Sequence, residues 1–177
     1  MKALLIIDMQ KGCFLPYSSR HDVLDIISRI NMLSAKFRKE QYPVIFIRHD
    51  GTSENELIPQ TDDWALLPEL TQVSTDLYID KTANDAFYQS GLQQALTARG
   101  IDELYITGAA TDFCVDATVK SAFSKDYKVT IISDCHTTED KTNFPAQSLV
   151  AHYNWVWSAM APTKQKISVV HASAVEL

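Results

Sequence analysis

An aspartate, a lysine and a cysteine each follow an apolar run of the sequence. Asp8 comes after LLII, Lys81 after LYID, and Cys114 lies in the segment after LYIT. A cysteine attacks a carbonyl group as its thiolate, a nearby carboxylate can take the thiol proton, and an ammonium group can stabilise both anions. These three residue types together predict nucleophilic catalysis by Cys114.

The stretch that contains Cys114, ELYITGAATDFCVDATVKSAF at 103–123, is typical of a strand, a turn and a helix. GAA at 108–110 forms a turn with little side-chain bulk, and Thr111 or Asp112 can cap the helix. Cys114 is then in the first helical turn, where free backbone N–H groups and the helix dipole favour a thiolate and could hold an oxyanion. The alternative is that Cys114 is a small buried apolar residue.

Apolar runs alternate with helical periods, and they predict the elements that position these residues. Strands are expected at 2–7, 44–49, 77–80, 104–107, 128–134 and 167–170, and helices at 19–40, 88–99, 111–123 and 145–160. The segment 50–75 is irregular, although DDWALLPEL at 62–70 can hold a short helix. This alternation predicts an α/β fold, a three-layer α/β/α sandwich with a six-stranded, mainly parallel, Rossmann-like sheet. Ligands bind beyond the carboxyl ends of such strands, so the three reactive residues should meet at one edge.

The composition and net charge limit the kinds of partner that are expected. With 177 residues, 46% hydrophobic and 21% charged, residues 1–177 are expected to form a single domain around one core. A net charge of −6 argues against nucleic acid and anionic membranes, so the expected partner is a small-molecule substrate. Three cysteines without pairing or metal-ligand spacing, and the lack of a long apolar run, predict a cytoplasmic protein.

Three motifs, LLIIDMQ, DKTANDAF and GAATDFCVDATVKSAF, resemble in this order those of the isochorismatase-like cysteine hydrolases. That family includes nicotinamidases, carbamoylsarcosine and ureidoacrylate amidohydrolases and isochorismatase, and the resemblance continues through SDCHTT and HYNWVW. It implies that Asp8, Lys81 and Cys114 are the catalytic residues. It also implies a cis peptide bond between Ala109 and Ala110, an oxyanion hole that includes Ala110 and Cys114, and a homo-oligomer, either a dimer or a tetramer.

The residues expected to bind substrate are less strongly indicated. Metal-dependent nicotinamidases of the family have an Asp-x-His pair after the second strand, whereas here His49 precedes Asp50, so no metal and no cofactor are expected. His49 is instead a candidate pocket wall or an ordinary loop histidine. Gln10 is expected to bond substrate or lysine, since it leaves the strand on the same side as Asp8. The aromatic candidates for the pocket are Phe14, Trp64, Phe87 and Phe113.

The leading hypothesis is a hydrolase that cleaves a small amide or carbamoyl C–N bond through a thioester on Cys114. One alternative is isochorismatase-type hydrolysis of a vinyl ether, which needs no covalent cysteine. Isochorismate is a dicarboxylate, and the candidate cations for it near the edge are Lys11, Arg20 and Arg48. Another alternative is a non-catalytic binding or redox-sensing module that uses Cys114 as a reversible thiol. A dinucleotide-binding domain is disfavoured, because no G-x-G-x-x-G follows the first strand.

Overall fold

The computed structural model describes residues 1–177, apart from the side chain of Ser19. The strands are β1 (Lys2–Ile7), β2 (Val44–His49), β3 (Leu77–Lys81), β4 (Glu103–Ala109), β5 (Lys128–Thr137) and β6 (Ser168–Val170). The α-helices are α1 (Lys11–Phe14), α2 (Val23–Lys39), α3 (Leu92–Ala98), α4 (Asp116–Ser124) and α5 (Ala146–Ala159). Short helical turns are η1 (Tyr17–Ser19), η2 (Thr52–Glu54), η3 (Thr111–Val115) and η4 (Ala172–Ala174).

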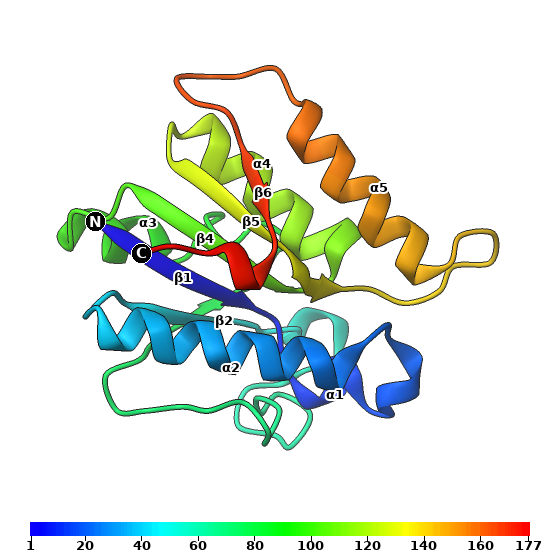
Figure 1. Cartoon of the computed structure of the whole chain (residues 1–177). Helices are drawn as coiled ribbons and strands as arrows, with labels where there is room; N and C mark the ends of the chain where they lie inside the picture. The colour runs from blue at the N-terminus through cyan, green and yellow to red at the C-terminus, as the bar shows by residue number, and fades with distance from the viewer.

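The strands form one six-stranded sheet in the order β3-β2-β1-β4-β5-β6. Each neighbouring pair is parallel, so the carboxyl ends of all strands lie at one edge. Helices lie on both sides of the sheet (Figure 1), which confirms the predicted three-layer fold. The strand order reverses between β1 and β4, and this switch point is where ligands bind in sheets of this type.

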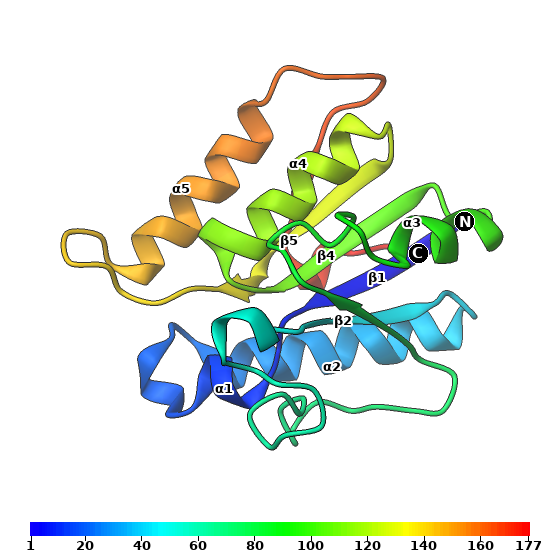
Figure 2. The same cartoon turned by 180° about the vertical axis from the view of Figure 1, so that it is seen from behind.

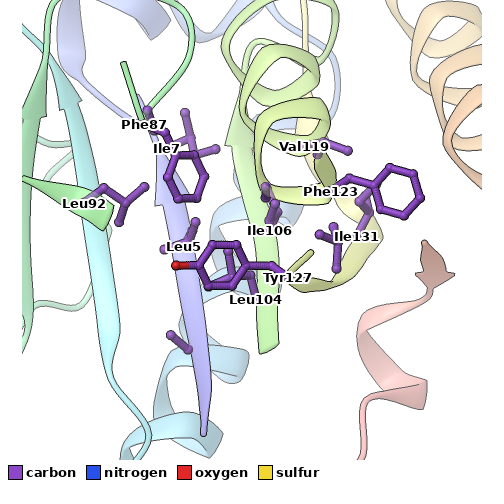
Figure 3. Close-up of a cluster of buried hydrophobic side chains, with 14 of the residues drawn as sticks. Leu5, Ile7, Phe87, Leu92, Leu104, Ile106, Val119, Phe123, Tyr127 and Ile131 are labelled. Carbon is purple, nitrogen blue, oxygen red and sulfur yellow. The ribbon is translucent and has the colours of Figure 1, made fainter. Parts of the chain in front are cut away.

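One face of the sheet is covered by α3, α4 and α5. The close-up in Figure 3 shows Leu5 of β1 and Ile106 of β4 facing Val119 of α4, with Leu92 of α3 beside them. All four side chains are fully buried. Burial of a side chain of this size stabilises a fold by about 1.5–3 kcal/mol. This packing fixes the relative positions of the two central strands whose ends carry Asp8 and Cys114.

The opposite face is covered by α2, which runs alone along the sheet (Figure 2). Its apolar residues repeat at helical spacing, and Ile26, Ile30, Leu33 and Phe37 are buried against β1, β2 and β4. The predicted helix at 19–40 is present from Val23 to Lys39, so it begins four residues later than predicted. Among the described residues, no helix has the length and apolar character needed to cross a bilayer.

The segment 62–70 does not form the short helix that its composition allowed. Its backbone pairs with the chain after β1: Lys11 N donates to Ala65 O, and Leu67 N donates to Met9 O. Pro68 also lacks the N–H that a helix would need at that point. The long loop is thus held against the carboxyl end of β1, next to the expected site.

Candidate active site

Three side chains at or just beyond the ends of different strands meet at the carboxyl edge. Lys81 Nζ lies 2.7 Å from Asp8 Oδ2 and 3.4 Å from Cys114 Sγ. The sequence predicted that Lys81 is the first residue after the third strand. In the structure it is the last residue of β3. Lys81 is paired in register with His49 of β2. The structure thus brings together the three residues that the sequence selected.

Asp8 turns the chain sharply at the end of β1. Its φ is 49°, in the left-handed region that aspartate tolerates better than most residues. Its N–H donates to Ile47 O, which keeps the turn in register with β2. Oδ2 pairs with Lys81, whereas Oδ1 is buried and has no hydrogen-bond partner among the described residues. That oxygen is therefore free to accept a proton.

Lys81 is fully buried as a side chain, and its charge is compensated within the site. Burial on its own would lower the pKa of Lys81, but the carboxylate of Asp8 and the sulfur of Cys114 oppose it, and the pKa lies above its ordinary value. Lys81 is therefore an ammonium group at neutral pH. Its positive charge is fixed between the carboxylate and the sulfur.

The helix turn was expected to favour a thiolate at Cys114, but in the free protein the surroundings of the sulfur favour the neutral thiol. Burial and the negative charge of Asp8 raise the pKa of the Cys114 thiol to about 12, although Lys81 acts in the opposite direction. The thiol also lies 3.4 Å from Asn84 Oδ1, which can accept its proton in a hydrogen bond. Cys114 therefore has to lose its proton during attack, and a base must be within reach.

The turn before Cys114 depends on Gly108. Its φ is 114°, and a Cβ atom there would lie 2.2 Å from Ile7 O, a backbone atom of β1. Only glycine fits this close approach. The peptide bond between Ala109 and Ala110 is cis, as the resemblance implied. The turn therefore brings the chain from β4 directly over the end of β1.

Cys114 lies in a π-helical turn, η3, and not in the first turn of an ordinary α-helix. The predicted capping roles of Thr111 and Asp112 are also wrong, because their side chains bond to a residue of β5 and to the residue after it. Thr111 Oγ1 lies 2.9 Å from His136 Nδ1, and Asp112 Oδ1 accepts a hydrogen bond from Thr138. Long-range contacts, and not a local cap, fix the start of the helix.

His136 connects this turn to α5. It is fully buried, and its Nε2 lies 3.0 Å from Asn154 Oδ1. Burial lowers the pKa of His136 to about 4, so the ring is neutral at pH 7. Because Asn154 Oδ1 can only accept, the proton is on Nε2, and Nδ1 accepts from the Thr111 hydroxyl. The chain Asn154–His136–Thr111 thus holds the nucleophile turn.

A pocket of about 250 Å³ opens beside the three residues. Its lining comprises Asp8, Cys13, Arg20, His49, Leu57, Asn84, Ala109, Ala110, Phe113 and Cys114. Two of the residues predicted to bind substrate, His49 and Phe113, are in this lining. His49 Nδ1 lies 3.2 Å from Lys81 Nζ. Burial and the charge of Lys81 lower the pKa of His49, so it is a neutral acceptor at pH 7.

Four other residues predicted to bind substrate lie outside the lining that the described residues form. Gln10 bonds the backbone of His49 through both amide atoms, and its Nε2 also donates to Trp64 O. Phe14 and Phe87 are buried in the two cores. Trp64 lies under the guanidinium of Arg48 at 3.9 Å. These are corrections, and they share one reason: residue type and proximity to a strand end do not fix the direction of a side chain.

The pocket also contains residues that the sequence analysis had not assigned to the substrate site. Asn84 lies inside the DKTANDAF motif, so its position could have been marked as a candidate. Arg20 had been considered only as one of three cations for a dicarboxylate. Cys13 comes from the short helix α1 and Leu57 from the loop after β2, and no local pattern indicates the direction of either side chain. Among the described residues, no group of three or more His, Cys, Asp or Glu side chains is arranged to hold a metal ion.

A thiol, an ammonium group and a carboxylate at the carboxyl edge of a doubly wound sheet define a class of α/β cysteine hydrolases. The sequence matches the Isochorismatase domain over residues 2–157. The chain therefore belongs to the isochorismatase family, whose members are hydrolases. This confirms the resemblance on which the sequence analysis relied.

Individual relatives agree with this assignment. The uncharacterized isochorismatase family protein YwoC of Bacillus subtilis is 32% identical over 152 residues, which cover 77% of each chain. Streptothricin hydrolase of Streptomyces noursei is 27% identical over 140 residues, 79% of this chain but only 51% of that protein. The chain thus spans about half the length of that relative. A crystal structure of an isochorismatase family protein superimposes with a TM-score of 0.87 and 30% identity, covering 96% of this chain and 97% of the other.

Proposed function

We propose that this protein cleaves a C–N bond of a small amide or carbamoyl compound through a thioester on Cys114. The observation that carries the proposal is the placement of Lys81 Nζ 2.7 Å from Asp8 Oδ2 and 3.4 Å from Cys114 Sγ. A carboxylate that is held beside a buried thiol can act as its base, and the ammonium group compensates the negative charge that moves between them.

In the first half of the reaction, Cys114 Sγ attacks the substrate carbonyl carbon while its proton passes to Asp8. The proton transfer accompanies attack, because the raised pKa of Cys114 leaves little thiolate beforehand. The carbonyl oxygen becomes an oxyanion, and the backbone N–H groups of Ala110 and Cys114 are the proposed donors for it. Asp8 then gives the proton to the departing nitrogen, the C–N bond breaks, and an amine or ammonia leaves.

In the second half, water attacks the thioester carbon. Asp8 takes a proton from the water, the C–S bond breaks, and the proton returns to the sulfur of Cys114. The products are an acid and the regenerated thiol. Lys81 keeps its proton throughout, since its pKa is raised. Hydrolysis of a vinyl ether would use an acid but would leave the nucleophile without a task, which is why we favour a carbonyl substrate.

A turnover screen tests the proposal. The purified protein and its Cys114→Ala variant are incubated with a panel of small amides, carbamoyl compounds and isochorismate, and release of amine, ammonia or pyruvate is measured. Cys135→Ala, which removes a buried thiol that does not line the pocket, is the matched control. We expect turnover of at least one amide or carbamoyl compound by the wild type and the control, and loss of that turnover in Cys114→Ala. Turnover of isochorismate alone, retained in Cys114→Ala, would contradict the proposal.

A further inference from the structure

Arg20 places a buried positive charge in the wall of the active-site pocket. Its side chain is only 10% exposed, and it lines the same pocket as Cys114. A buried guanidinium is costly unless its donors are paired. The proposed chemistry of Asp8, Lys81 and Cys114 makes no use of this charge, so its place in the pocket needs a separate explanation.

The hydrogen bonds of Arg20 leave part of its donor capacity unused. An arginine has five N–H donors. Nε donates to the backbone oxygen of Cys13, and Nη2 lies 3.1 Å from Glu139 Oε1. Nη1 is buried and has no hydrogen-bond acceptor among the described residues. A group that brings its own oxygen acceptors would complete this set, and carboxylates suit the planar geometry of the guanidinium.

The guanidinium is held in position by its surroundings. Its Cζ atom lies 5.0 Å from the centre of the Phe14 ring, within the range of a cation–π contact. The backbones of Arg20 and Glu139 form a β-bridge, which ties this loop to the segment after β5. Phe14, which the sequence suggested as a substrate contact, thus supports the arginine instead. A donor group fixed in this way loses little conformational freedom when it binds a ligand.

We propose that the substrate carries a carboxylate, which Arg20 binds while the scissile carbonyl lies at Cys114. This inference rests on the proposed function and names the substrate class for it. The pocket volume of about 250 Å³ is below the usual range of about 300–1,000 Å³ for ligand pockets. A substrate that fills so small a space contacts both residues. The substrate class is therefore small amides or carbamoyl compounds with an anionic end.

The first test compares two alkylating agents that differ in charge. Iodoacetate carries a carboxylate and iodoacetamide does not, so the ratio of their rates at Cys114 reports how the pocket treats an anion. We expect this ratio to exceed the ratio measured for glutathione under the same conditions. We expect Arg20→Gln to lower the ratio roughly tenfold or more, as for loss of a hydrogen bond between charged groups. The ratio for Arg20→Lys should lie between those of the wild type and Arg20→Gln, because lysine keeps the charge but lacks the planar guanidinium group.

Arg99→Gln is the matched control, since it removes the same charge from an exposed position after α3. It should leave the ratio unchanged. The iodoacetamide rate is an internal check on folding, because a disturbed pocket would alter that rate as well. A wild-type ratio no higher than that of glutathione, or an equal ratio in the wild type and Arg20→Gln, would overturn the inference.

A second test uses the unmodified protein. Succinamate and 4-methylpentanamide have similar shapes, but only succinamate has a carboxylate. We expect succinamate to slow the labelling of Cys114 by iodoacetamide at concentrations at which 4-methylpentanamide has no effect. Equal protection by the two compounds, or protection by 4-methylpentanamide alone, would contradict a carboxylate site.

These outcomes separate the inference from the proposed function. Preference for anions at Cys114 without turnover of any amide would refute the proposed function and leave the anion site standing. Turnover of neutral amides and of their carboxylate analogues at equal rates, unaffected by Arg20→Gln, would refute the anion site and leave the proposed function standing.

Discussion

The two sides of the active-site pocket are built in different ways. On one side, Asp8, Lys81 and Cys114 lie at or just beyond the ends of strands, and their separations are fixed by strand register and by the buried core. On the other side, Arg20 and Leu57 come from loops that are held by contacts between distant segments. The comparison suggests that the strand side carries the chemistry and the loop side selects the substrate. Changes on the first side should therefore affect kcat, and changes on the second should affect KM.

The largest effect is expected for Asp8→Asn on the strand side. This change keeps the shape of the side chain but removes the base that takes the thiol proton. General acid–base groups typically contribute 10²–10⁴-fold, so kcat should fall by roughly 10³-fold, or about 4 kcal/mol. The measurement is steady-state kinetics with a substrate found in the screen. A fall in kcat of less than about tenfold would show that Asp8 is not the base.

The separation between the two sides explains how much of the site the sequence could predict. Long apolar runs end at Asp8, Lys81 and beside the Cys114 turn, and parallel strands bring such ends together whatever the loops do. Arg20 could not be placed in this way, because its position depends on a bridge to Glu139, which lies 119 residues further along the chain.

The internal geometry of the Cys114 turn also could not be predicted from local sequence patterns. Capping preferences predicted that Thr111 or Asp112 would bond the helix backbone, but Thr111 bonds to His136 in β5 and Asp112 bonds to Thr138 just after that strand. The same contacts tie the turn to β5 and to the residue after it. The fold class and the strand boundaries, in contrast, follow from short-range apolar patterns, which is why they were predicted nearly to the residue for β1 and β2.

A second prediction concerns the stability of the strand side and its dependence on pH. His136 is neutral in the folded protein with a pKa of about 4, whereas an unfolded histidine titrates near about 6.5. Between these values the unfolded chain binds one more proton, so stability falls as the pH falls from about 6.5 to about 4. Between pH 7 and pH 4, the free energy of unfolding of the wild type should fall by about 3 kcal/mol more than that of His136→Gln.

Denaturant unfolding of both proteins at several pH values measures this difference. His152→Gln, at an exposed position of α5, controls for the loss of an imidazole. Wild type and His136→Gln curves that run parallel between pH 7 and pH 4 would show that the buried histidine does not set the acid sensitivity.

The smallest effect is expected at Phe113, a half-exposed residue at the pocket. Phe113→Ala removes an apolar wall but leaves the three reactive groups in place. KM should rise severalfold, corresponding to about 1 kcal/mol of lost apolar contact, while kcat stays within about twofold. Phe144→Ala, at another exposed phenylalanine that does not line this pocket in the described structure, should change neither constant. A fall in kcat at constant KM would show that Phe113 contributes to the chemical step and not to substrate binding.

Trapping of the covalent intermediate tests directly whether Cys114 forms a thioester with the substrate. The wild-type protein is mixed with a substrate from the screen, quenched in acid within one turnover, and examined by intact mass spectrometry and peptide mapping. We expect a mass increase equal to the acyl group, located on Cys114 and missing in Cys114→Ala. Rapid turnover of the same substrate without any adduct in the wild type, and with activity retained in Cys114→Ala, would contradict this expectation.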